Sequence, residues 1–279
     1  MKAFQNEGAR LTLYDEAPEW QGKTFAVGQH RFSSLNAGLA LLNEASAYAR
    51  EQGATSLIGP MEGDTWHPYR LVSESDGRAP FLMEPETGIH DLPAFTKAGF
   101  EVISSYFSAE VALSDAISQT VINSLPGLKI SPWDGQDPEV LLREVHRLSL
   151  QAFAQNPFFK SITAEAFLDL YLPLVPFLNP ELILFARDPQ GALQGFLFGL
   201  PNYAEGPEPK SVILKSYASL QKGVGQRLSS QFYRAARDAG YSHAIHALMH
   251  ERNLSAERSA GNGGKRFRRY ALMGLNLGR

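Results

Sequence analysis

One succession of predicted elements occurs twice in this chain, and it limits the possible folds more than any other feature. Residues 24–60 and residues 211–249 both predict a strand, a turn, one helix of about four to five turns, a glycine and a second strand. Gly53 ends the helix of the first copy, and Gly240 ends the helix of the second. The chain is therefore expected to contain two versions of one structural unit.

The remaining elements of the first half are mostly strands. Residues 9–15 predict a strand before the first copy, and residues 100–111 predict a strand after a short helix through Phe95. Between the first copy and that helix lies an irregular polar and aromatic segment, residues 60–91. This half is expected to be rich in strands and to have one long helix.

The second half begins with helices. Asp137 can cap a helix that has Pro138 at its first position, and residues 163–172 predict another helix. A tight turn at residues 187–192 joins two strands as a hairpin, and a short irregular segment precedes a last strand at residues 269–277. Together the two halves predict an α+β fold with a mixed sheet.

The boundary between the halves is expected near the middle of the chain. The apolar pattern changes around residues 112–136, and proline, aspartate and glycine are concentrated at the end of this stretch, in residues 131–140. A chain of 279 residues with 44% hydrophobic residues is long enough for two cores of ordinary size. We therefore expect two units, residues 1–120 and residues 121–279.

Charge and cysteine content narrow the classes of function. The chain has 26 Lys and Arg against 29 Asp and Glu, a net charge of −3, so no overall basic field attracts nucleic acid. Its only candidate basic patch is Lys265, Arg266, Arg268 and Arg269. It has no cysteine, which excludes disulfides, thiolate metal sites and a cysteine nucleophile. No run approaches the roughly 20 apolar residues of a membrane helix, and we expect a cytoplasmic protein without a membrane or nucleic-acid partner.

A turn with two glycines precedes the helix of the second copy. Gly223 and Gly225 lie where a predicted strand passes into a helix, so several backbone N–H groups and the positive end of the helix dipole meet at one point. A Cβ atom there would obstruct a ligand, and phosphate is the group that such a turn suits. A dinucleotide-binding motif would need a third glycine where Leu228 stands. The alternative is a turn that simply opens a helix.

With these residues the second half resembles the GCN5-related N-acetyltransferase (GNAT) family. In that family the pyrophosphate of acetyl-coenzyme A lies on an Arg/Gln-x-x-Gly-x-Gly/Ala turn, and the matching stretch here is "LQKGVG", residues 220–225, with Leu220 at the Arg/Gln position. The first half is similar to the family's closing motif at Gly99 and Phe100, but its helix entrance, "QHRFSSLNAG", lacks the glycine pair. The resemblance implies two GNAT-like units, each a mixed, mostly antiparallel sheet flanked by helices, with the phosphate site only in the second.

The resemblance also implies which residues contact acetyl-coenzyme A. Contacts are expected from the strand before the glycine turn, from the turn itself and from the segment after the next strand. These residues are Ser216, Ala218, Ser219, Gln221, Lys222, Gly223, Val224, Gly225, Gln226, Asn253 and Ser255. For Asn253, capping of the segment after the strand is an equal alternative.

Acyl transfer to an amine needs a base and can use an acid. His250 and Glu251, at the end of a strand, are candidates for the base, because a histidine titrates near neutrality. The acid could be Tyr217 or Tyr270, or the thiolate could leave without one. Neither a His-Glu-x-x-His motif, nor a carboxylate cluster with metal spacing, nor a Ser-His-Asp signature occurs, so we expect no metal.

A dense group of aromatic and polar residues in the first half is a candidate substrate site. The candidates are Trp66, His67, Tyr69 and Arg70, with Asp64 and Glu84 nearby in the sequence. The alternative is a loop held by its own side-chain contacts, with its aromatic rings in a small core of their own.

The sequence therefore predicts an acetyl-coenzyme A-dependent N-acyltransferase that modifies a small amine or an amino acid derivative. Two alternatives stay open. One is a degenerate, non-catalytic protein that binds an acyl-coenzyme A or another ligand. The other is a transferase of the same doubled fold that takes amino acids from charged tRNA, which would need a basic channel.

Overall fold

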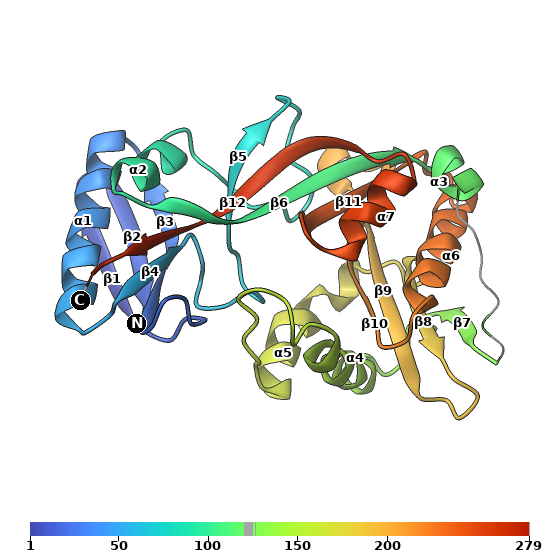
Figure 1. The fold of residues 1–279 in the computed structure, drawn as a ribbon. Helices are drawn as coiled ribbons and strands as arrows, with labels where there is room; N and C mark the ends of the chain where they lie inside the picture. Colours follow the sequence, from blue (N-terminus) through green and yellow to red (C-terminus); the bar gives the residue numbers. More distant parts are fainter. Residues whose placement is uncertain (120–124, 126, 279) are drawn as a thin grey trace.

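The computed structural model describes residues 1–119, 125 and 127–278 (Figure 1). The first half contains six strands and three helices among these residues, and it begins with a strand that the sequence did not predict. In order they are β1 (Lys2–Asn6), β2 (Ala9–Tyr14), β3 (Thr24–Phe32), α1 (Leu35–Glu51), β4 (Ser56–Gly59), β5 (Leu71–Ser75), α2 (Asp91–Lys97), β6 (Glu101–Ala112) and α3 (Leu113–Gln119).

The second half carries the two predicted helices, the hairpin and the second copy of the repeated unit. Its elements are β7 (Lys129–Pro132), α4 (Pro138–Ala152), α5 (Ala164–Tyr171), β8 (Ile183–Arg187), β9 (Leu193–Pro201), β10 (Ser211–Ser219), α6 (Val224–Asp238), β11 (His243–His250), α7 (Leu254–Gly261) and β12 (Lys265–Asn276). Short 3₁₀ turns at Leu172–Phe177, Pro180–Leu182 and Tyr203–Glu205 connect some of them.

All the strands of the described residues belong to one sheet of 12 strands. Eleven of them follow the order β1-β2-β3-β4-β12-β6-β11-β10-β9-β8-β7, and β5 pairs with β12. The pairs β3–β4 and β10–β11 are parallel, and the other pairs are antiparallel. Each parallel pair is connected by one helix, α1 or α6, as a crossover between parallel strands requires. The mixed, mostly antiparallel sheet is thereby confirmed, and the predicted succession of strand, helix and strand is found twice.

The long strands β6 and β12 connect the two halves (Figure 1). β12 pairs with β4 through Met273–Asn276, and β6 pairs with β11 through residues 106–112. The end of the chain thus lies beside strands from its beginning, and Ala271, Met273 and Leu277 complete the core beneath α1. Because the sheet runs without a break, the division into units 1–120 and 121–279 stays a prediction, and the boundary falls in part on residues outside the described ones.

Helices cover both faces of the second half of the sheet. On β8, Ile183 and Phe185 pack with α4 and α5, whereas Leu184 and Ala186 face the core beneath α6. Since alternate residues of a strand point to opposite faces, α4 and α5 lie on one face and α6 lies on the other. The two sides of the sheet in this half are therefore covered by different helices.

Four local expectations need correction. The segment of residues 60–91, expected to be irregular, contains strand β5, which pairs with β12. Asp137 is the N-cap of α4, but its φ is 44° and its side chain caps no N–H. The segment expected to be irregular after β11 contains α7, and β12 starts at Lys265 rather than at residue 269, so the basic cluster lies in a strand. No helix among the described residues is long and apolar enough to cross a membrane.

Candidate functional site

The glycine turn lies between β10 and α6, as expected. Gly223 is the N-cap of α6 and has φ 91°, a conformation that suits glycine because a Cβ would be strained there. Gly225 has another role, since an ideal Cβ on it would lie 2.9 Å from Nη1 of Arg258 and 3.3 Å from both Ser219 Oγ and Tyr217 Cε2. The missing side chain therefore lets these three side chains approach the first turn of α6 closely.

Several N–H groups of this turn are open. Among the described residues, the N–H groups of Gly223, Gly225 and Gln226 have no hydrogen-bond acceptor, and no acidic side chain stands in the first turn of α6. Helix α1 begins differently, because Ser34 Oγ accepts the N–H of Ala37. The open end of α6 can therefore bind an anion through its donors and its dipole.

Arg258 is a site residue that sequence reasoning missed. It lies in α7, partly buried beside Gly225, and no ion pair of its side chain is found among the described residues. It adds a full positive charge to the open end of α6. Its helix was read as an irregular segment, so nothing in the sequence indicated that Arg258 would face the turn.

Strands β10 and β11 separate next to the turn. They pair in parallel only from Ser211 with His243 to Leu214 with His246. Beyond this point β10 stays paired with β9 and β11 stays paired with β6, and both strands have an irregularity, at residues 214–216 and at residues 246–249. Ser216, Tyr217, Ala218 and Ser219 lie on the part of β10 that has left β11. One edge of this backbone is available to a ligand.

His250 and Glu251 are neighbours in sequence but have different surroundings. The His250 ring packs edge-on against Tyr106 at a centroid distance of 5.2 Å. Partial burial lowers the pKa of His250, and the positive charges of Arg252 and Arg70 lower it further. Glu251 Oε1 lies 3.9 Å from Nη1 of Arg266 and 3.7 Å from Nη2 of Arg269. His250 is therefore favoured as a neutral ring, and its Nδ1 accepts the N–H of Arg252 at 3.1 Å. Glu251 is turned toward the basic cluster of β12.

The other candidates after β11 also have assigned places. Asn253 is the N-cap of α7, but its side chain makes no capping hydrogen bond, and Ser255 is partly buried in the first turn of that helix. Among the turn residues, Gln221 and Lys222 are exposed and Val224 is buried in the core beneath α6. The expected contact of Gln221 and Lys222 with a ligand stays a prediction.

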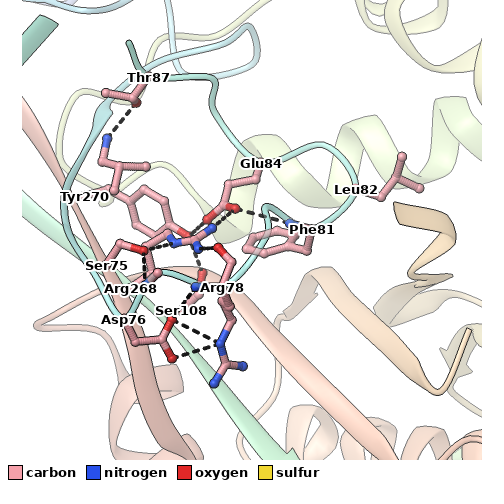
Figure 2. Close-up of polar contacts among 12 residues, drawn as sticks. Ser75, Asp76, Arg78, Phe81, Leu82, Glu84, Thr87, Ser108, Arg268 and Tyr270 are labelled. Carbon is pink, nitrogen blue, oxygen red and sulfur yellow. Dashed lines mark hydrogen bonds and ion pairs between the residues drawn. The ribbon is translucent and has the colours of Figure 1, made fainter. Parts of the chain in front are cut away.

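Tyr270 lies in a buried polar network (Figure 2). Its hydroxyl donates to Glu84, which also forms an ion pair with Arg268, and it accepts from Ser108 Oγ at 3.0 Å. Ser108 in turn accepts the N–H of Leu248, within the irregular part of β11. Burial and the neighbouring Glu84 raise the pKa of Tyr270. Tyr270 therefore supports the irregular part of β11 through Ser108. Of the two tyrosines considered as the acid, Tyr217 is the one beside the glycine turn.

The aromatic loop of the first half contacts the second half. Trp66 Nε1 donates to the carbonyl of Lys160 at 2.8 Å, and its ring packs against Phe153, Phe159 and Phe167. His67 Nδ1 lies 2.8 Å from Asp64 Oδ1. The loop is thus held on the face covered by α4 and α5, where Trp66 belongs to the core and His67 is partly exposed.

Tyr69 and Arg70 lie closer to the separated strands. The Arg70 guanidinium carbon is 3.8 Å from the centre of the Tyr69 ring and 4.1 Å from that of Tyr106. Nη1 of Arg70 donates to the carbonyl of Leu248 at 2.9 Å. Burial raises the pKa of Tyr69, so its hydroxyl stays protonated at neutral pH. The sequence singled out Arg70 but not Lys215 of β10, whose amine is close enough to Arg70 to be affected by its charge.

Two surface hollows lie away from these residues. One, of about 630 Å³, is lined by residues including Asn6, Arg31 and Thr87, and the other, of about 400 Å³, is lined by residues including Phe4 and Glu62. Neither contains a residue of the glycine turn or a candidate catalytic group. No group of three or more His, Asp or Glu side chains that could hold a metal ion occurs in the described part of the chain.

Comparison with known proteins shows the fold. No protein-family profile matches the chain, and no curated protein sequence matches it. The solved structures that are similar to it include the following three. A tandem GNAT protein from the clavulanic acid biosynthesis pathway has 16% identity and a TM-score of 0.56 over 98% of this chain and 80% of its own. A GCN5-related N-acetyltransferase from Sphaerobacter thermophilus has 12% identity and a TM-score of 0.56 over 98% and 78%.

The third, a GCN5-related N-acetyltransferase from Anabaena variabilis, has 12% identity and a TM-score of 0.56 over 97% of this chain and 63% of its own. At such identities the likeness concerns the fold alone. The resemblance seen in the sequence is confirmed at that level: the chain has the GCN5-related N-acetyltransferase fold over nearly its whole length.

Proposed function

We propose that this protein is an N-acyltransferase that uses acetyl-coenzyme A and acts on a small amine or an amino acid derivative. The observation that carries the proposal is the open N-terminus of α6 beside the point where β10 and β11 separate. The fold supports an acyltransferase kind of activity, since its structural neighbours include N-acetyltransferases. The cofactor site belongs to the second of the two proposed units, because α1 has no comparable open turn.

In this proposal the pyrophosphate lies on the glycine turn. The N–H groups of Gly223, Gly225 and Gln226 donate to its oxygens, and Arg258 supplies positive charge from α7. The pantetheine arm follows the separated edge of β10, where Ser216 to Ser219 offer backbone groups. Gln221, Lys222, Asn253 and Ser255 border this path as further contacts.

The chemistry is a direct attack on the thioester. The amine nitrogen of the acceptor bonds to the carbonyl carbon, the carbon–sulfur bond breaks, and the proton of the amine passes to a base. His250 is the candidate for that role because its lowered pKa keeps the imidazole neutral near pH 7. Its Nδ1, which accepts the N–H of Arg252, exchanges that hydrogen bond for the proton of the amine. Tyr217, whose ring borders Gly225, remains the candidate that would protonate the departing thiolate.

The acceptor approaches from the face of α4 and α5. Tyr69 and Arg70 lie at the irregular part of β11, and Trp66 and His67 hold the same loop against the helices. Cofactor and acceptor then reach the reaction centre from opposite faces of the sheet, between β10 and β11.

One observation favours a second function, a non-catalytic acyl-coenzyme A-binding protein. Glu251 is directed toward Arg266 and Arg269, and Tyr270 is buried in its network, so two of the four acid and base candidates have other partners. This alternative keeps the cofactor site and lacks turnover.

The experiment is a measurement of coenzyme A release from acetyl-coenzyme A with a thiol reagent, over a broad panel of primary amines and amino acids. The expected result is release that depends on at least one acceptor, and a decrease in kcat of about 10²–10⁴-fold in His250→Gln. His243→Gln, at the other end of β11, is the control and should retain activity. Binding of acetyl-coenzyme A without release for any acceptor would favour the non-catalytic alternative.

A further inference from the structure

Arg70 is a buried cation whose guanidinium is only partly satisfied. Its side chain comes from the loop before β5, and the residue is 7% exposed. Nη1 donates to Leu248, and the two tyrosine rings cover the guanidinium, but Nε is buried and has no hydrogen-bond partner. No carboxylate of the described residues pairs with it. A buried donor without an acceptor costs free energy unless a ligand satisfies it.

Lys215 is a second cation in the same place. It occupies the irregular part of β10 between Leu214 and Ser216, directly after the last residue that pairs with β11. The side chain is partly buried, and its amine has no hydrogen bond or ion pair with any described residue. Burial and, to a smaller extent, the charge of Arg70 lower the pKa of the Lys215 amine to about 8.

The acidic side chains near Arg70 and Lys215 have other partners. Glu84 pairs with Arg268, Glu251 faces Arg266 and Arg269, and Asp64 contacts His67. Arg70, bonded to β11 at Leu248, and Lys215, on β10 directly after its last pair with β11, thus both lie where the strands separate, without a counter-charge from these residues. Two like charges in a partly dry environment repel, and an anion between them would relieve both the repulsion and the open Nε.

We propose that Arg70 and Lys215 bind a carboxylate of the acceptor, so that the substrate is an amino acid or another amine that carries a carboxylate. This inference rests on the proposed function, and it names the acceptor class of the same site. The carboxylate accepts hydrogen bonds from Nε of Arg70 and from Nζ of Lys215. It lies on the face covered by α4 and α5, across the sheet from the glycine turn on α6.

The position also fits the reaction. Arg70 is hydrogen-bonded to Leu248 of β11, and Lys215 lies at the irregular part of β10. A carboxylate bound by both side chains therefore lies where β10 and β11 begin to separate. An amine close to that carboxylate would then lie next to the path of the thioester along β10. His250 and Arg70 both pack on the ring of Tyr106, which brings the proposed base close to Arg70.

The test measures binding of carboxylates and of matched neutral compounds. The probes are N-acetylglycine, N-acetylleucine, N-acetylphenylalanine and N-acetylglutamate, each with its carboxamide counterpart, titrated by calorimetry in the presence of coenzyme A. We expect at least one acid to bind at least tenfold more tightly than its amide. In Lys215→Met this preference should fall to about twofold or less, whereas acetyl-coenzyme A should bind as it does to the natural protein.

Two variants keep the test decisive. Arg70→Gln should also lose the preference, but it removes the contact with Leu248 and could unfold the protein, so Lys215→Met is the main variant. Lys97→Met removes an exposed lysine of α2 and should change neither affinity. Equal binding of acids and amides, no binding of any acid, or a preference that survives in Lys215→Met would overturn the inference.

The result also separates this inference from the proposed function. If Lys215→Met weakened acetyl-coenzyme A as much as the acids, the two cations would serve the cofactor and the inference would be wrong. If the natural protein preferred acids but did not bind acetyl-coenzyme A, the proposed function would fail while the carboxylate site would stand.

Discussion

At the scale of single residues, His246 shows how burial determines a titration. Its Nε2 lies 2.9 Å from the hydroxyl of Tyr233 on α6, and its Nδ1 lies 2.7 Å from Oγ of Ser259 on α7. Burial lowers the pKa of His246 to about 4. The imidazole is therefore neutral in the folded protein at pH 7, and it holds both helices against β11 as a structural group.

This lowered pKa makes stability depend on pH. A histidine in the unfolded chain titrates near pH 6.5. The contribution of neutral His246 to stability is therefore fully present above about pH 6.5, and it is lost as the pH falls from about 6.5 to about 4. A shift of this size corresponds to about 3 kcal/mol. We expect the free energy of unfolding in urea, measured at pH 7.5 and pH 4.5, to fall by about that much more in the natural protein than in His246→Gln. The same pH dependence in both proteins would contradict this account.

At the scale of elements, the network of Figure 2 fixes the segment after β5 to β12 and β6. Glu84 and Arg268 form an ion pair in which both side chains are almost fully buried. Removal of one partner leaves an uncompensated buried charge, so Glu84→Gln should lower the free energy of unfolding by about 3–5 kcal/mol. Urea unfolding followed by circular dichroism measures this loss.

The control lies two residues away. Glu86 pairs with Arg31 at the surface, and Glu86→Gln should change stability by less than about 1 kcal/mol. Similar losses in Glu84→Gln and Glu86→Gln would contradict the importance of burial.

At the scale of the whole molecule, the halves depend on each other through β6 and β12. The core beneath α1 contains Ala271, Met273 and Leu277, which come from the end of the chain. Residues 1–119 alone would expose that core and leave β4 and β6 without β12, the strand that pairs with both. We expect this fragment to show no cooperative unfolding transition in urea, and we expect the same fragment linked to residues 265–278 to regain one. A cooperative unfolding transition of fragment 1–119 alone, with the same stability as the linked fragment, would contradict the interdependence of the two halves.

The sequence predicted what depends on local pattern. Gly223 and Gly225 indicated an open helix start, and the spacing of strand, helix and strand indicated two copies of one unit. The position of Arg258 depends on the packing of α7, and Lys215 acquires its surroundings only where two bulged strands separate. The pairing of β12 with β4 joins residues more than 200 positions apart, and no local signal carries such a contact.

The open turn on α6 is the central claim, and binding of acetyl-coenzyme A tests it most directly. Calorimetry should compare the natural protein with Gly225→Asp, which places a carboxylate among the open N–H groups and beside Arg258, with which it can pair without unfolding the protein. Gly261→Asp is the control, since a side chain there meets open space. We predict that the natural protein and the control bind acetyl-coenzyme A, whereas a folded Gly225→Asp does not. Absence of binding by the natural protein, at cofactor concentrations up to the millimolar range, would contradict the claim.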